Sequence, residues 1–403
     1  MASVFETFWR LGPAAFVMKA ILAALFLNVS LLAFILVRRS YRKRYFAKRD
    51  AKVFEIRQNW SALISGKIPY ETWRTKAFAR TTIEAMVLDA FEPAGPDESA
   101  RLLRFLRASG LLERQISEAR ARRGWRRHRA LVALGRTRAP EAIPALAEGL
   151  RDRMLETRLA SLRGLERMAC PEAAKAILDW VAGEGICVPG LPLQTALIQC
   201  CAERPQVLLP YLRHTETATR EVLGRVLGEV ATVSVASELL PFADDALPEI
   251  RAAAARAMSQ ADPRQAIEVL SQLAEDSVWY VRLRAVVSLG KLGHQSGIPP
   301  LLRGLCDSNR LVRLRAAEGL VNLKAERLSI LEKVVATHDR YALYAYLTAI
   351  DNAGLQPELE ARVRSAEQLS EPARTVLLDV VHTGSLPSRD LAEVKTSAAT
   401  AAH

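Results

Sequence analysis

The sequence predicts an all-α protein in which one transmembrane helix precedes an αα-solenoid with a repeat of about 31 residues. Three observations lead to this fold. The chain has 403 residues, of which 50% are hydrophobic but only 6% are aromatic. Its apolar content is therefore mainly Ala, Leu, Val and Ile, which suits closely packed helices. An uninterrupted apolar stretch occupies residues 20–37, and similar segments recur at a constant interval farther along the chain.

The apolar stretch from Ala20 to Val37 contains no charged residue. A helix of this length extends over about 27 Å, which is close to the hydrocarbon thickness of a bilayer. We place the transmembrane helix at residues 13–37, because proline suits a first helical turn. A cleaved signal peptide is one alternative, but it carries its basic residues before the apolar core. A buried core helix is the other, and the charge that follows the stretch argues against it.

A basic juxtamembrane segment, residues 38–51, follows the apolar stretch. Its membrane-interface candidates are Arg38, Arg39, Arg42, Lys43, Arg44, Lys48 and Arg49. The positive-inside rule places this segment in the cytoplasm and residues 1–12, a short N-terminus, on the extracytoplasmic side. The same side chains can contact anionic lipid headgroups. We therefore expect a single-pass protein of a bacterial inner membrane with a cytoplasmic body.

The distribution of charge sets this segment apart from the rest of the chain. Residues 1–130 contain 25 basic and 11 acidic residues, an excess of 14. The whole chain has a net charge of +12, so the remaining residues carry a net charge of −2. A body that binds nucleic acid would need the opposite distribution. We therefore expect no nucleic-acid partner.

Similar helical segments recur along the body. They occupy residues 125–135, 158–166, 220–228, 249–259, 280–290 and 311–321, with a degenerate copy at 192–202. A second helical pattern follows many of them and often opens with proline, as at residues 140–150, 171–181, 205–212 and 263–273. Two helices of about 10–12 residues and two turns fill the repeat, and each pair buries its apolar face only against its neighbours.

One polar pattern keeps the same register. Arginine recurs at intervals of 31 or 62 residues, at Arg127, Arg158, Arg220, Arg251, Arg282 and Arg313. Aspartate stands six residues before four of these arginines, at Asp152, Asp245, Asp276 and Asp307. A motif present in most units indicates a structural role, with carboxylates near helix N-termini and guanidinium groups paired with them. A catalytic carboxylate–arginine array is the alternative.

The pattern Asp…V-R-x-x-A, clearest in residues 276–285 and 307–316, resembles the HEAT repeat. The short period resembles the subgroup also found in phycocyanobilin lyases. The resemblance covers about residues 120–381 and implies an Asp–Arg ladder between successive turns of a solenoid that serves mostly as a binding surface. We therefore predict a HEAT-like solenoid at residues 119–384, a helical cap or linker region at 52–118, and a flexible tail at 385–403.

The sequence contains no phosphate-binding glycine loop, zinc-binding motif or nucleophile elbow. We therefore expect no enzyme activity and no catalytic, metal or cofactor site. The five cysteines are predicted to be free buried thiols. Two clusters are candidates for binding a partner, since Arg and aromatic residues are enriched at interfaces. The basic cluster is Arg120, Arg122, Arg123 and Arg126, and the aromatic one is Trp279, Tyr280, Tyr341, Tyr344 and Tyr346. Core packing is the alternative for the aromatic cluster.

We expect a membrane-anchored scaffold that positions a partner, an integral membrane protein, beside the inner membrane. Residues 104–152 resemble membrane-anchored bacterial HEAT proteins that accompany glycosyltransferases of exopolysaccharide biosynthesis. This resemblance implies a glycosyltransferase accessory subunit. A HEAT-type lyase or cofactor-maturation factor is one alternative and would need a ligand pocket in the concave face. A nucleic-acid-binding HEAT protein is the other.

Overall fold

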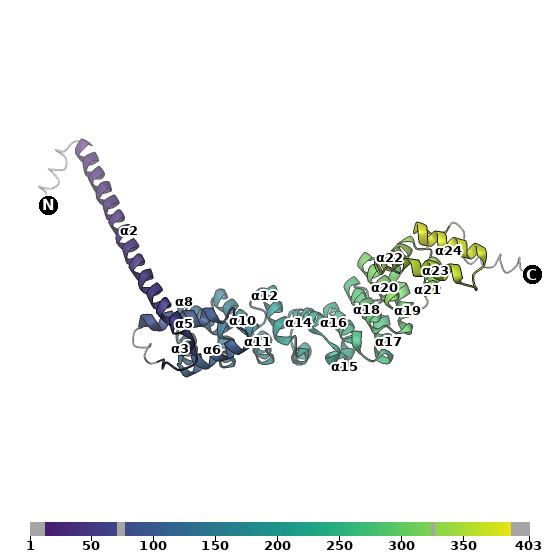
Figure 1. Cartoon of the computed structure of the whole chain (residues 1–403), viewed down its shortest axis with the longest axis horizontal. Coiled ribbons are helices and arrows are strands. Elements are labelled where there is room, and N and C mark those ends of the chain that lie inside the picture. Colours follow the sequence, from purple (N-terminus) through teal and green to yellow (C-terminus); the bar gives the residue numbers. More distant parts are fainter. Residues whose placement is uncertain (1–12, 71–76, 324–326, 388–403) are drawn as a thin grey trace, which may run out of the picture. The chain divides into compact units, whose positions relative to one another are not determined.

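The structure is a computed structural model that describes residues 13–70, 77–323 and 327–387. Throughout these residues the regular structure is helical and no strand occurs, so the predicted all-α class is confirmed. The chain divides into two compact units, residues 1–115 and 116–403, and Figure 1 shows the order of their helices. The predicted N-terminal segment 1–12 and residues 388–403 of the predicted tail lie outside the described residues.

The first unit begins with one continuous helix, α2, at Pro13–Gln58. Its apolar part has a mean hydropathy of 2.7 and is not buried anywhere in the structure, so α2 contains a candidate membrane span. The helix does not stop at residue 37, where the apolar stretch ends, but continues through the basic segment. The reason is local: no glycine occurs in α2, and its only proline is at the first position. The separate segments predicted at 13–37 and 38–51 are therefore one helix, about 69 Å long.

Four helices follow α2. These are α3 (Trp60–Ile64), α5 (Ala77–Ala90), α6 (Pro96–Ala108) and α7 (Leu111–Ala121), the last of which crosses the boundary between the units. Helix α2 contacts α5, and the rings of Tyr45 and Phe78 meet edge to face at 5.5 Å. Ile56, Leu63 and Ile83 are fully buried. The core of the first unit thus begins on the same helix as the candidate span.

The second unit is a row of helix pairs that follow one another in chain order (Figure 1). We call the first helix of each pair the A helix. The A helices are α8 (Trp125–Thr137), α10 (Leu155–Met168), α12 (Gly190–Cys201), α14 (Thr217–Val230), α16 (Pro248–Ala257), α18 (Trp279–Leu292), α20 (Arg310–Asn322) and α22 (Arg340–Asn352). Each of them contacts the next A helix. This arrangement confirms the predicted αα-solenoid.

The second helix of each pair is called the B helix and often opens with a 3₁₀ turn. The B segments are η1 (Pro140–Ala142) with α9 (Ile143–Gly149), α11 (Pro171–Glu184), η2 (Pro205–Leu208) with α13 (Leu209–His214), η3 (Val233–Val235) with α15 (Ala236–Leu239) and η4 (Leu240–Phe242), α17 (Pro263–Leu273), η6 (Gln295–Gly297) with α19 (Ile298–Leu305), α21 (Arg327–Val335) and α23 (Gln356–Ser365). Helix α24 (Glu371–Thr383) ends the described body. Proline at the first turn costs no internal hydrogen bond, which explains these starts.

Two pairs of neighbouring A helices meet at glycines. A Cβ atom built on Gly135 would lie 2.6 Å from the Cα of Gly164, and one built on Gly290 would lie 2.8 Å from the Cα of Gly319. Any side chain at these positions would push the two backbones apart. Gly228 has the same register as Gly135 and Gly290, but its Cβ would meet no atom within 4 Å. The close approach is therefore a property of particular helix pairs, α8 with α10 and α18 with α20.

We predict that Gly290→Ala lowers the free energy of unfolding by about 2 kcal/mol, because the added methyl group overpacks the α18–α20 contact. The matched control is Gly228→Ala, which we expect to be neutral or stabilising by up to about 1 kcal/mol, since alanine favours helix where space allows. Urea unfolding followed by circular dichroism measures both variants. Equal destabilisation by the two substitutions would contradict the close-contact explanation.

Candidate partner-binding face

Ion pairs between arginine and aspartate connect neighbouring repeats along the A helices. The pairs are Arg127–Asp152 at 2.9 Å, Arg220–Asp245 at 2.5 Å, Arg251–Asp276 at 2.6 Å and Arg282–Asp307 at 2.6 Å. In each pair the aspartate follows the arginine by 25 residues and so belongs to the next repeat. The side chains are between 7% and 24% exposed, which limits screening by water.

The aspartate six residues before an arginine has a different role from the one 25 residues after it. The Nη1 atoms of Arg251, Arg282 and Arg313 donate to the main-chain carbonyls of Asp245, Asp276 and Asp307, at 2.8, 2.8 and 2.7 Å. Each ladder arginine in this run therefore holds the loop of its own repeat. Where the next repeat supplies an aspartate, the same guanidinium also holds that carboxylate.

Each aspartate carboxylate also accepts from the main chain at the start of an A helix. Asp276 accepts from the Val278 N–H at 2.8 Å, and Asp307 accepts from the Asn309 N–H at 2.7 Å. Burial would raise the pKa of Asp276, but the hydrogen bonds from Arg251 and from the Val278 N–H outweigh it, and the pKa lies below its usual range. The same balance, with Arg282 as donor, lowers the pKa of Asp307. The carboxylates are thus ionised and fully engaged in holding the scaffold.

The ladder lacks a carboxylate at two places. Gly183 stands where the partner of Arg158 would be, and the Nη2 of Arg158 donates instead to the Cys187 carbonyl at 3.1 Å. This interruption lies at the degenerate repeat. Beyond Arg313 the position is His338, and the Arg313 guanidinium lies 5.2 Å from the centre of the Tyr341 ring. The last ladder arginine therefore contacts an aromatic ring in place of an acid.

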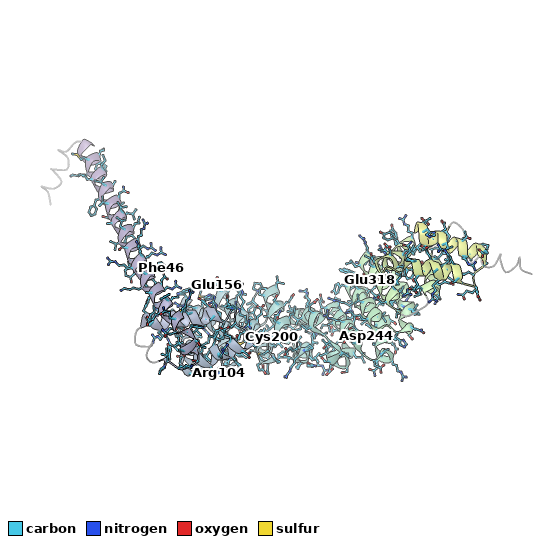
Figure 2. All side chains as sticks on the ribbon, viewed as in Figure 1. Phe46, Arg104, Glu156, Cys200, Asp244 and Glu318 are labelled. Atoms are coloured by element: carbon cyan, nitrogen blue, oxygen red, sulfur yellow. The ribbon has the colours of Figure 1, made fainter. Side chains whose placement is uncertain are left out.

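The residue directly after a ladder arginine lines a pocket in five of the repeats. These residues are His128, Leu159, Ala252, Leu283 and Leu314. Because they share a register, they lie on the same side of their A helices. We call this side, with the pockets on it, the pocket face. Figure 2 labels Glu156 and Glu318, which belong to the A helices α10 and α20 of the same row.

The first pocket on this face has a volume of about 390 Å³ and lies between α8 and α10. His128, Arg136, Arg163, Arg167 and Glu156 contribute its charged or titratable side chains. The middle pocket has a volume of about 670 Å³ and is lined by residues of α12, α14, α16, α18 and α20. Trp279 and Tyr280, two of the predicted aromatic candidates, belong to this middle pocket.

Charges in the middle pocket neutralise one another. Arg225 is paired with Glu221, Arg284 lies 3.1 Å from Glu229, and Arg315 lies 2.6 Å from Glu318. The Tyr280 hydroxyl donates to Glu249 at 3.2 Å, and nearby negative charge together with burial raises the pKa of this tyrosine. The middle pocket therefore presents a balanced polar surface around aromatic rings.

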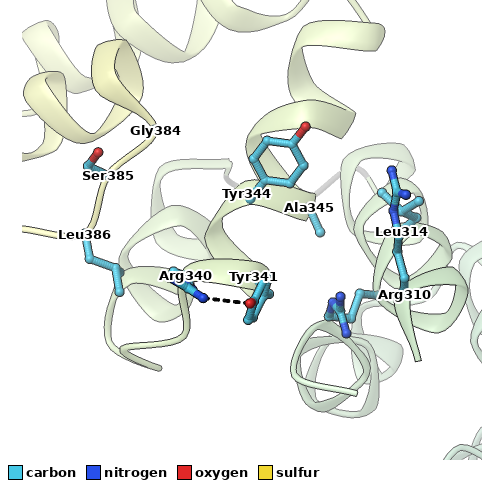
Figure 3. Close-up of a pocket in the computed structure, with 10 residues that line it drawn as sticks. Arg310, Leu314, Arg340, Tyr341, Tyr344, Ala345, Gly384, Ser385 and Leu386 are labelled. Atoms are coloured by element: carbon cyan, nitrogen blue, oxygen red, sulfur yellow. Dashed lines mark hydrogen bonds between the residues drawn. The ribbon is translucent and has the colours of Figure 1, made fainter. Parts of the chain in front are cut away.

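The end pocket lies between α20, α22 and residues 384–386, and its volume is about 700 Å³ (Figure 3). Tyr341 and Tyr344 line it and are 51% and 62% exposed. Tyr346, predicted as a third candidate on this helix, is fully buried, and its hydroxyl donates to the Arg327 carbonyl at 3.2 Å. Tyr346 thus packs in the core, as the alternative interpretation had it, and a partner cannot reach it.

The predicted basic cluster lies at the turn between α7 and α8. Arg122, Arg123 and Arg126 are exposed, and Arg120 lies 3.3 Å from Glu148. Trp125 lies in their midst but was not among the predicted candidates; it is 70% exposed and stacks on His128. The sequence itself shows a tryptophan among these arginines, and this composition could have added Trp125 to the predicted cluster. The cluster therefore extends up to the first pocket.

The remaining predicted groups are placed as follows. All seven basic residues of the juxtamembrane segment are exposed on α2.

The five cysteines are free, but only Cys200 and Cys201 are buried, and burial raises the pKa of each to about 12. Cys187 and Cys306 are exposed, so the prediction of buried thiols is wrong for these two. Among the described residues, no group of three His, Cys, Asp or Glu side chains could hold a metal ion.

Comparison with known families identifies the repeat. The family of HEAT repeats matches residues 205–286 and 267–351, and the PBS lyase HEAT-like repeat matches residues 126–152. The chain is a HEAT-repeat protein. The predicted resemblance to HEAT repeats is thereby confirmed. The four Arg–Asp pairs of the ladder lie within the matched residues, and Arg158 lies between them. Comparison with curated proteins gives no match.

Solved structures similar to this HEAT-repeat protein include an engineered protein, with 16% identity, a TM-score of 0.37, and coverage of 75% of this chain and 95% of that one. Another is human deoxyhypusine hydroxylase in complex with glycerol, with 19% identity, a TM-score of 0.26, and coverage of 75% of this chain and 96% of that one. The identification as a HEAT-repeat protein rests on the family matches and the geometry of the ladder.

We predict that Asp307→Asn lowers the free energy of unfolding by about 2 kcal/mol at pH 7, because Arg282 loses its charged partner in a mostly buried site. The folded pKa of Asp307 lies below the unfolded value of about 3.9. Its stabilisation is therefore present above that value and is lost as the pH falls through the folded pKa. Urea unfolding at a series of pH values should show the variant and the wild type converging in acid.

The control for this prediction is Glu318→Gln, which removes the exposed Arg315–Glu318 pair on the same helix as Arg313. We expect a change of less than about 0.5 kcal/mol from this substitution, because exposed ion pairs contribute little. A difference between Asp307→Asn and the wild type that stayed constant from pH 7 into acid would show that the ladder charge does not stabilise the fold.

Proposed function

We propose that this HEAT-repeat protein is a membrane-anchored scaffold whose pocket face binds a partner protein beside the membrane. The observation that carries the proposal is a row of pockets with exposed aromatic and arginine side chains on a solenoid that follows a candidate span. Arginine and aromatic residues contribute strongly to protein–protein binding. A regular solenoid presents them along an extended surface rather than in one closed site.

The anchoring part of the proposal rests on α2. Its apolar part is long enough to cross a bilayer, and seven exposed basic residues follow it directly on the same helix. Basic residues next to a span favour the cytoplasmic side and attract anionic lipid headgroups. The proposed orientation therefore puts the N-terminus outside a bacterial inner membrane and the solenoid in the cytoplasm.

The proposed partner is an integral membrane protein, and the specific candidate is a glycosyltransferase of exopolysaccharide synthesis. Support for this candidate comes from the sequence of residues 104–152, which resembles membrane-anchored HEAT proteins that accompany such enzymes. The proposed role is accessory: the solenoid positions the enzyme and performs no chemistry itself.

We predict that Leu25→Arg combined with Leu32→Arg releases the protein from membranes into the carbonate-soluble fraction. Each charge in the middle of the span costs about 3 kcal/mol of insertion free energy. The control is Leu191→Arg, a similar change at an exposed leucine of α12. The wild type and the control should stay in the membrane pellet. Release of the wild type by carbonate would overturn the anchor.

We also predict that purification of the full-length chain in mild detergent recovers an integral membrane partner in stoichiometric amount, detected by mass spectrometry. The proposed specific partner predicts a glycosyltransferase among the recovered proteins. A stoichiometric partner of another class would overturn the glycosyltransferase assignment and leave the scaffold role in place. Recovery of no stoichiometric partner would overturn the scaffold role itself.

A further inference from the structure

The end pocket differs from the middle pocket in its charge. Among the described residues, three arginines line it, Arg310, Arg313 and Arg340, and no carboxylate does. None of these three guanidinium groups forms an ion pair with any residue in the described part of the chain. In the middle pocket, by contrast, Arg284 and Arg315 each lie next to a glutamate of the same surface. The end pocket therefore holds positive charge that the described structure does not neutralise.

The acids nearest to the end pocket in sequence are already engaged. Asp307 is bound by Arg282, and its second oxygen accepts from the Asn309 N–H. Asp339 accepts from the Tyr341 N–H at 2.8 Å and the Ala342 N–H at 3.4 Å, which caps the start of α22. Neither carboxylate lines the pocket. Among the described residues, the arginines of the end pocket therefore have no acid beside them in the lining.

Contacts with Tyr341 fix two of the three guanidinium groups. The Arg340 Nη2 donates to the Tyr341 hydroxyl at 2.7 Å, and the Arg340 guanidinium lies 4.7 Å from the centre of the ring (Figure 3). Arg313 lies 5.2 Å from the same ring centre. Cation–π contacts hold both groups in place without neutralising them. Preorganised guanidinium groups lose less conformational entropy when they bind a carboxylate.

Apart from Ser385, the side chains in the rest of the lining are apolar or aromatic. Leu314, Ala345 and Leu386 contribute apolar side chains, and the exposed Tyr344 ring stands between them (Figure 3). Residues 384–386 form one side of the pocket and follow α24 directly, and the C-cap residue Gly384 has a φ of +66°. A ligand that fits must therefore combine negative charge with an apolar group.

We propose that the end pocket binds an acidic peptide segment of the partner protein. A glutamate or aspartate carboxylate of the peptide pairs with Arg310 and Arg340, and an adjacent apolar side chain packs against Tyr344 and Leu314. Charge complementarity favours this occupant, and exposed tyrosine with arginine is the composition typical of protein interfaces. This inference rests on the proposed scaffold function and specifies the chemistry by which the pocket face recognises its partner.

The direct experiment measures the anisotropy of a labelled, end-blocked peptide with two glutamates on each side of one tryptophan, mixed with the full-length protein in nanodiscs. We expect saturable binding that weakens at least tenfold in Arg310→Gln combined with Arg340→Gln. The matched control is Arg303→Gln, which changes an exposed arginine of α19 that lies 2.8 Å from Glu275 and lines none of the three pockets. This control should change binding by less than twofold.

Further measurements show whether the pocket recognises the carboxylates of a peptide or a phosphate group. A peptide with glutamine in place of glutamate should bind at least tenfold more weakly, and binding of the acidic peptide should weaken as salt rises. Equal binding of the two peptides, or equal loss in the Arg303→Gln control, would overturn the proposal. So would complete displacement of the peptide by millimolar inorganic phosphate or by phosphatidylglycerol vesicles, because the pocket would then recognise phosphate and not a peptide.

The purified complex distinguishes failure of this inference from failure of the scaffold role. Recovery of the same partner in the same amount with Arg310→Gln and Arg340→Gln would overturn the peptide pocket and leave the scaffold in place. Loss of the partner in this variant, but not in Arg303→Gln, supports both. Charge-dependent peptide binding without any membrane partner would support the pocket and overturn the scaffold.

Discussion

The contact on which the solenoid depends is an arginine that holds two repeats at once. Arg282, for example, donates to the loop carbonyl of Asp276 in its own repeat and to the carboxylate of Asp307 in the next. A solenoid repeat buries its apolar face only against its neighbours. A polar contact that fixes both partners therefore sets the register in which that face is buried, and the low exposure of these side chains protects the contact from water.

Fixing one position on each A helix also fixes the positions beside it. The residue after each ladder arginine returns to the same side of the row, and in five repeats it lines a pocket. The ladder itself ends where the next repeat offers no aspartate. At Arg313 the guanidinium turns to the ring of Tyr341 and becomes part of the end pocket. The same arginine position thus serves the scaffold in the middle of the row and the binding face at its end.

The periodic features could be predicted from the sequence, and the local ones could not. The spacing of Arg251, Arg282 and Arg313 predicts the repeat, because each repeat has the same neighbours. Tyr344 and Tyr346 stand two positions apart on one helix, and only packing against the start of α21 decides that Tyr346 is buried. For α2, the change in hydropathy after Val37 marks the end of the candidate span but not the end of the helix. No glycine or proline interrupts α2 after Pro13, so the helix continues through the basic segment.

The net charge of the body conceals how its charges are arranged. A net charge near zero after residue 130 argues against a nucleic-acid groove, which needs a long basic surface. It does not exclude a local excess of positive charge. In ion pairs such as Arg284–Glu229 the two charges neutralise each other, whereas an arginine without an acid partner leaves its positive charge at the surface. In the ladder, the acid that pairs with the arginine of one repeat comes from the next repeat. Arg313, the last ladder arginine, has no such acid among the described residues, and it lines the pocket with the exposed tyrosines.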